Sequence, residues 1–225
     1  MQELWTQWQR DWRWMEAIAI KRQWEVTQLK IALPASSAAL AAVELRHGLK
    51  FPPQLRVVLT ELSAAVQFGW HTPSHLQALE RENMPFSGGI RDAIWNLSHI
   101  DTYAIDNFLG WKRNLAHRDR SEAPNSPELW ENQFPFAVLP NGDMLTIDMS
   151  NKEPSRQPVR YFSHDLEMIH GLALAPNFYS FVSVYAKLGC AGAEWFNWLS
   201  FGIVNEAAGE FHLSTETDGA KAWLA

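Results

Sequence analysis

The sequence has almost no cysteine: Cys190 is the single one among 225 residues. One thiol cannot form a disulfide within a chain, and structural zinc sites usually draw on several cysteines. A lone free thiol is typical of proteins in a reducing compartment. The sequence therefore predicts a cytoplasmic protein that is held together by an apolar core, without a disulfide framework or a bound metal.

The chain also lacks an excess of basic residues. It has 19 Lys and Arg against 25 Asp and Glu, which gives a formal net charge of -6. Binding to phosphate backbones without sequence preference depends on a basic surface. We therefore expect no nucleic-acid partner, and we expect a mildly acidic surface that favours basic partners.

Long apolar runs are missing as well. No stretch approaches the roughly 20 apolar residues that a membrane-spanning helix needs. The first residues, MQELWTQWQRDWRW, carry charges from the start and contain no apolar core, so we expect no secretory signal peptide. Hydrophobic residues make up 47% and charged residues 20% of the chain, as in ordinary globular proteins. We expect a folded protein without a membrane partner.

Tryptophan, in contrast, is abundant, with 12 residues. Several recur at spacings of three and four near the N-terminus, together with Met15 and Ala19, which predicts an amphipathic helix with an aromatic seam. The absence of Gly and Pro from Trp5 to Lys30 extends this predicted helix through the segment. Its basic residues are Arg10, Arg13, Lys21, Arg22 and Lys30. We interpret residues 1–33 as a separate Trp-rich helix that packs on a main domain.

Helical patterns dominate the first half of the remaining chain. Pro34 separates the N-terminal segment from a helix that Ser36 or Ser37 caps and Gly48 ends. Pro53 suits the first turn of the next helix. The predicted helices cover residues 38–47, 53–62, 75–81 and 98–115, with a strand at 63–70, a strand or loop at 90–94 and an exposed loop at 118–127.

Strand patterns follow. Two apolar runs, 134–139 and 144–149, flank Asn141-Gly142, which supplies the positive φ angles of a tight hairpin turn. Residues 159–162 add a third antiparallel strand, and 177–188 form an amphipathic helix. Residues 195–201 are expected to cover the core, and 205–225 to form a tail or a short terminal helix. This order predicts an α+β fold with an antiparallel sheet of about four to six strands and helices packed around it, in a domain spanning 34–204.

Four motifs in this order resemble the SUKH superfamily, the Smi/Knr-type domain. They are VELRHGLKFPP at 43–53, IWNL at 94–97, FPFAVLPNGDMLTIDM at 134–149, and LAPNF at 174–178 with Phe181. The resemblance spans about residues 35–201. It implies a non-enzymatic protein-binding domain without a cofactor, because bacterial members bind and neutralise a cognate toxin, often a nuclease. Fungal relatives act as regulatory scaffolds, which is the alternative role, and the oligomeric state stays open.

The hairpin carries the acidic residues that we predict to contact a partner. Asp143 and Asp148, with Glu131, Glu153 and Asp165, would form an acidic edge that meets basic groups of a toxin. Trp70 ends a predicted strand beside a polar loop and is our aromatic candidate. A purely structural role for Asp143 in the turn and for Asp148 on the solvent face of its strand is the alternative. If the hairpin is not the interface, the basic, Trp-lined helix from Trp5 to Trp24 is the next candidate.

A metal-dependent hydrolase is the rival hypothesis. It would use Asp143, Asp148, His164 and His170, whose oxygen and nitrogen atoms are plausible metal ligands. However, their spacing matches no zinc motif such as H-E-x-x-H, and histidines six residues apart do not share one helical face. The sequence also lacks the Gly-x-Ser-x-Gly pattern of a serine nucleophile. We therefore predict no catalytic residue.

Overall fold

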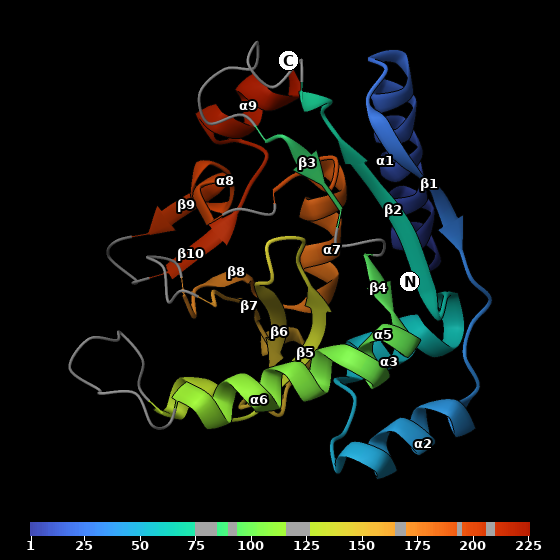
Figure 1. Ribbon diagram of the computed structural model, residues 1–225, viewed down its shortest axis with the longest axis vertical. Helices are drawn as coiled ribbons and strands as arrows, with labels where there is room; N and C mark the ends of the chain where they lie inside the picture. The colour runs from blue at the N-terminus through green and yellow to red at the C-terminus, as the bar shows by residue number, and fades with distance from the viewer. Residues whose placement is uncertain (75–84, 90–93, 116–126, 165–169, 193–194, 206–209) are drawn as a thin grey trace.

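The computed structural model describes residues 1–74, 85–89, 94–115, 127–164, 170–192, 195–205 and 210–225. Helices surround three antiparallel sheets of four, four and two strands within these ranges, so the predicted α+β class is confirmed (Figure 1). The strands that we expected in one sheet are thus divided between two, and the two-stranded sheet was not expected. No helix in the described part of the chain is both long and apolar enough to cross a bilayer.

The first sheet is built around β2 (Ala65–His71), which pairs with β1 (Glu25–Ile31), β3 (Ser87–Gly88) and β4 (Trp95–Asn96). Val66, Phe68 and Trp70 are buried on one face of β2, as the alternation in the sequence predicts. Before β2 lie α2 (Ser37–His47), α3 (Pro53–Val57) and a π-helix at Val58–Leu62. The Ser36 hydroxyl caps α2, and Gly48 ends it with a φ of 64°.

The second sheet is the predicted meander, in the order β5 (Gln133–Val138), β6 (Met144–Asp148), β7 (Val159–Phe162) and β8 (Ala173–Ala175). A short helix, α5 (Leu97–His99), and a π-helix at Ile100–Ala104 lead into α6 (Ile105–Leu115), which covers one face. Short 3-10 helices lie at Pro127–Trp130 and Pro154–Arg156. The opposite face packs on α7 (Phe178–Lys187), whose N-cap is Asn177, so this sheet is buried from both sides.

An aromatic cluster joins the N-terminal helix α1 (Gln2–Lys21) to this core. The indole of Trp95 on β4 lies 6.4, 6.3 and 5.8 Å from the rings of Trp5, Trp8 and Trp12, respectively. The ring of Phe178 on α7 also packs against Trp95, with ring centroids 6.1 Å apart. The Trp95 indole N–H donates to the Ser63 carbonyl at 3.0 Å, which satisfies its polar atom. The helix α1 is therefore part of the core.

The expectation that the N-terminal helix continues to Lys30 was wrong. The helix ends at Lys21, Gln23 takes a positive φ of 58°, and residues 25–31 form β1. The absence of Gly and Pro was misleading, because the segment contains β-branched residues, among them Val26 and Thr27, and pairs with β2. Because β1 belongs to the first sheet, contacts cross the boundary that we expected at residue 33.

The C-terminal segment also contains more structure than its weak pattern predicted. After α8 (Trp195–Ser200), strands β9 (Gly202–Asn205) and β10 (Glu210–Leu213) pair with each other, and α9 (Asp218–Leu224) follows. The predicted terminal helix is present, whereas the hairpin was missed. The predicted helix at 75–81 and loop at 118–127 lie wholly or almost wholly outside the described residues, and so do residues 90–93 of the segment at 90–94.

We predict that Trp95→Ala lowers the free energy of unfolding by about 3–5 kcal/mol, because the lost ring leaves a cavity in the α1–α7 interface. The matched control is Trp14→Ala, since the Trp14 side chain on the same helix is 43% exposed. The control should cost less than about 1 kcal/mol. Denaturant unfolding followed by circular dichroism measures both. Equal losses in the two variants would show that Trp95 does not organise the core.

Candidate functional site

Asp143 of the β5–β6 hairpin is buried and fully engaged within the molecule. Its side chain is 3% exposed. One carboxylate oxygen accepts a hydrogen bond from the backbone N–H of His164 at 2.9 Å and lies 2.6 Å from His164 Nδ1. The other accepts from the Tyr161 hydroxyl and, at 2.7 Å, from Asn141. Asp143 thus ties the hairpin turn to the end of β7, in line with its structural interpretation.

Asp148 does not lie on the solvent face of its strand, and this interpretation was wrong. The strand β6 is covered on both faces, because α6 packs on one side and the main core on the other. Arg160 Nε donates to one Asp148 oxygen at 2.9 Å, and the Ser150 N–H donates to the other at 2.9 Å. Burial alone would raise the pKa of Asp148, but hydrogen bonds from Ser150 and Arg160 lower it overall.

The remaining acids of the predicted edge are not free charges. Glu153 is exposed, but it forms an ion pair with Arg156 at 3.2 Å and accepts from Ser155. Glu131 forms an ion pair with Lys112 at 2.9 Å. Asp165 lies outside the described residues. Among the four described acids, Glu153 and Glu131 therefore reach solvent, and each has a basic partner.

Trp70 is a core residue. It is 3% exposed, and its indole N–H donates to the Gly189 carbonyl at 2.8 Å. Its ring stacks on Trp24 at 4.9 Å and on Trp223 at 5.2 Å, with interplanar angles of 28° and 16°. These contacts bring β2, the α1–β1 turn and α9 together. A direct contact between Trp70 and a partner stays a prediction, although its ring is covered in the free chain.

The four residues of the hydrolase hypothesis separate into different environments. His164 approaches Asp143, whereas Asp148 pairs with Arg160. The His170 ring packs against Trp130 and Phe162, and burial lowers its pKa to about 4. Within the described ranges, no three His, Cys, Asp or Glu side chains converge as metal ligands would. Cys190 is fully buried, and burial raises the pKa of its thiol well above the ordinary value, which makes it a poor nucleophile.

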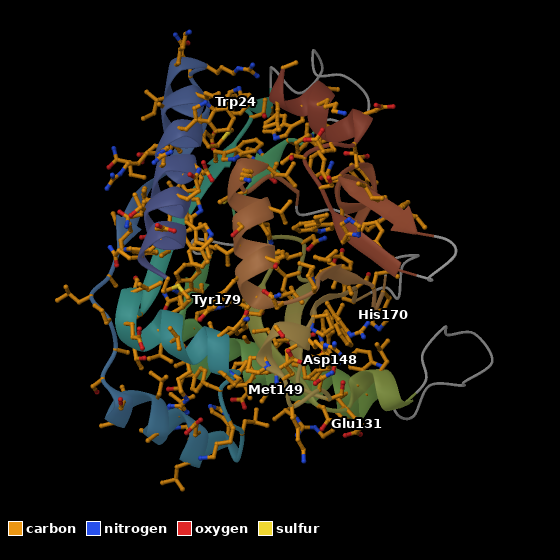
Figure 2. The ribbon with its side chains drawn as sticks, turned by 180° about the vertical axis from the view of Figure 1, so that it is seen from behind. Trp24, Glu131, Asp148, Met149, His170 and Tyr179 are labelled. Atoms are coloured by element: carbon orange, nitrogen blue, oxygen red, sulfur yellow. The ribbon has the colours of Figure 1, made fainter. Side chains whose placement is uncertain are left out.

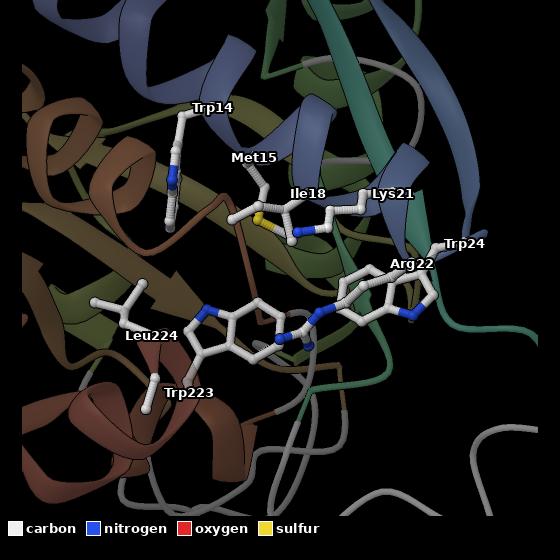
Figure 3. A pocket seen from close by; sticks show the side chains of 9 residues that line it. Trp14, Met15, Ile18, Lys21, Arg22, Trp24, Trp223 and Leu224 are labelled. Atoms are coloured by element: carbon white, nitrogen blue, oxygen red, sulfur yellow. The ribbon is translucent and has the colours of Figure 1, made fainter.

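A pocket lies instead between α1 and α9, at the end of the molecule away from Asp148 and Glu131 (Figure 2). Its cavity volume is about 280 Å³. The apolar residues of its wall are Trp14, Met15, Ile18, Trp24, Trp223 and Leu224, and Lys21, Arg22 and Ala225 complete it (Figure 3). The Arg22 guanidinium carbon lies 5.3 Å from the centre of the Trp24 ring, a cation–π distance.

The outer face of α1 continues this pocket as a basic surface. Arg10, Arg13, Lys21 and Arg22 are exposed, and Ile20 and Trp14 lie among them. The two acids in this part of the helix are partly buried and have partners within the chain. Asp11 accepts from Gln7 at 2.7 Å, and Glu16 accepts from the Leu29 N–H at 2.7 Å. We call these six exposed residues, from Arg10 to Arg22, the α1 face.

Sequence periodicity identified α1 as basic and Trp-lined but not this pocket. The pocket depends on Trp223 of the weakly patterned C-terminal segment, which donates to the Leu188 carbonyl at 2.9 Å. No local signal connects residue 223 with residue 24, so the sequence alone could not have placed the two rings 6.1 Å apart.

Comparison with known proteins yields one family. The family model described as SMI1 / KNR4 family (SUKH-1) matches residues 34–183, two thirds of the chain. This match includes the hairpin and most of α7, and it leaves α1, β1, α8, β9, β10 and α9 outside. No curated protein matches the chain.

We predict that Asp148→Asn lowers the free energy of unfolding at pH 7 by about 1–3 kcal/mol, because Arg160 loses a charge-assisted partner. The folded-state pKa of Asp148 lies below its ordinary value of 3.8. Its contribution is therefore complete above about pH 4 and is lost as the pH falls through the folded-state pKa. The loss of stability in acid should be smaller in the variant. Denaturant titrations over a pH series test this, with the exposed Glu153→Gln as control; equal acid sensitivity in Asp148→Asn and the parent would contradict it.

Proposed function

The chain belongs to the SMI1/KNR4 family (SUKH-1), and from this premise we propose that it is a bacterial immunity protein that binds and neutralises a cognate toxin. The family fits a non-enzymatic immunity or regulatory role. In the proposed role the chain acts by binding a protein and needs neither a cofactor nor a metal. Its net charge of -6 gives no support for a nucleic-acid partner.

One observation carries the preference for binding over catalysis. The carboxylates that a hydrolase would use already accept hydrogen bonds within the fold. Asp143 accepts from Tyr161 and His164, and Asp148 accepts from Arg160. Buried carboxylates with this many partners fix a shape and leave little capacity to hold a metal or activate a water. Exposed tryptophan and arginine, in contrast, are the residue types enriched in protein interfaces.

Within this proposal, Glu153, in the connection between β6 and β7, is the acid of the predicted edge that we expect at the rim of the contact. A rim charge mainly changes the rate of association. Asp143, Asp148 and Trp70 then act indirectly, because they set the shape of the surface. Substituting them should reduce the melting temperature and binding together, whereas substituting Glu153 should leave the melting temperature unchanged.

The direct test is protection. We expect cells that express a toxin encoded beside this gene to survive when the chain is co-expressed, and the purified pair to form a stable complex. Glu153→Lys should slow association with a basic toxin, and Glu153→Gln should have a smaller effect. A chain that binds a host regulator but protects against no neighbouring toxin would favour the scaffold role. Turnover of a substrate by the chain alone, sensitive to Asp143→Asn, would overturn the binding proposal.

A further inference from the structure

We propose that the pocket between α1 and α9, with the α1 face beside it, binds an acidic segment of the partner protein that inserts one aromatic side chain. This inference rests on the proposed function, since it assigns chemistry to the partner. It also gives the partner segment the opposite charge to the one expected from the hairpin. The hairpin acids have partners within the chain, whereas the described cations of α1 form no ion pair.

The wall of the pocket carries aromatic rings that suit one planar group. Trp24 and Trp223 lie with an interplanar angle of 12° and centroids 6.1 Å apart, and Trp14 stands at the opposite wall. Pockets for drug-sized ligands run to about 300–1,000 Å³, so a volume of about 280 Å³ suits a single side chain better than a whole small molecule. An aromatic ring in this pocket would bury apolar surface and would also make edge or face contacts with the tryptophans.

The positive charge of the α1 face predicts that acidic residues flank this ring in the partner. In the part of the chain that the structure describes, Lys21 and Arg22 form no ion pair with a carboxylate, and Arg10 and Arg13 donate to the neutral side chains Gln7 and Gln9 at 3.3 and 3.4 Å. The four exposed cations therefore form no ion pair within the described residues, although the partly buried carboxylate of Asp11 attracts Arg10. Ala225 also lines the pocket, but it does not pair with either cation.

Two other occupants fit less well. A cationic ligand would suit stacked tryptophans, but Arg22 already occupies the cation–π position over Trp24 and would repel it. A membrane surface would need the apolar seam of α1, which is buried against Trp95 and α7. Trp14 and Ile20 alone offer little area for insertion. An extended acidic peptide can place one ring in the pocket and carboxylates along the α1 face.

Indole N–H resonances provide the readout, because each tryptophan gives its own signal in a ¹⁵N spectrum. We would titrate the full chain with a pentapeptide in which acidic residues flank one phenylalanine. The signals of Trp14, Trp24 and Trp223 should shift, and that of Trp95 should not. Binding should weaken as ionic strength rises. A peptide with alanine in place of phenylalanine should bind at least about tenfold more weakly.

Variants separate the pocket from general charge. Arg22→Glu and Trp14→Ala should each lower the affinity for the acidic peptide by at least about tenfold. The melting temperatures of both variants should stay close to that of the parent. Lys152→Glu makes the same charge change at an exposed residue away from α1 and should change affinity by less than about twofold. If the peptide fails to shift these signals, or if both pocket variants bind it like the parent, the inference is overturned.

Two further experiments distinguish a peptide from a lipid surface as the occupant, and the pocket proposal from the immunity proposal. Vesicles of phosphatidylcholine with phosphatidylserine should leave the Trp14 signal unchanged; binding of vesicles through Trp14 and Arg22 would overturn the protein-segment assignment in favour of a lipid surface. Peptide binding without protection against a neighbouring toxin would overturn the immunity role and support the pocket. Protection that survives Arg22→Glu and Trp14→Ala together would overturn the pocket and leave the immunity role standing.

Discussion

The structure depends on the packing of the α1 tryptophans around Trp95. Trp95 lies on the two-residue strand β4 and touches Trp5, Trp8, Trp12 and Phe178, so one ring links α1, the first sheet and α7. Each buried tryptophan removes on the order of 150–250 Å² from water. Because this seam fixes the rotation of α1 about its axis, it also fixes which residues point outward. The basic and aromatic α1 face is thus a consequence of how the core is packed.

Charged residues also fall into two groups, those that stabilise the fold and those that lie on the surface. Asp143 and Asp148 are too deeply buried to leave uncompensated, and their hydrogen bonds to Tyr161, His164 and Arg160 hold the meander in register. These bonds leave the two carboxylates little capacity to serve a partner directly. Exposed cations that form no ion pair within the described residues lie on α1, which is outside the matched family region. We infer that specificity comes from this added helix, and that the shared domain supplies the scaffold.

Local patterns predicted the local parts of this structure. The stripe of α1 as far as Ala19, the capped helix α2, the face of β2 and the Asn-Gly hairpin all follow from spacing and turn chemistry. Burial of charged residues was not predictable, because it depends on α6 and α7 covering both faces of β6. The ending of α1 at Lys21 was missed since no Gly or Pro marks it, and the pocket was missed because Trp24 and Trp223 meet only through the tertiary fold.

Native-state hydrogen exchange tests most directly whether α1 and the family domain are one cooperative unit. Amides in the middle of α1 and in α7 should open with the same free energy, close to that of global unfolding, because the Trp95 cluster cannot be broken on one side alone. Opening of α1 at a free energy lower than that of α7 by more than about 2 kcal/mol would contradict the account. The helix would then be a separate arm, and its outward face would not be fixed by the core.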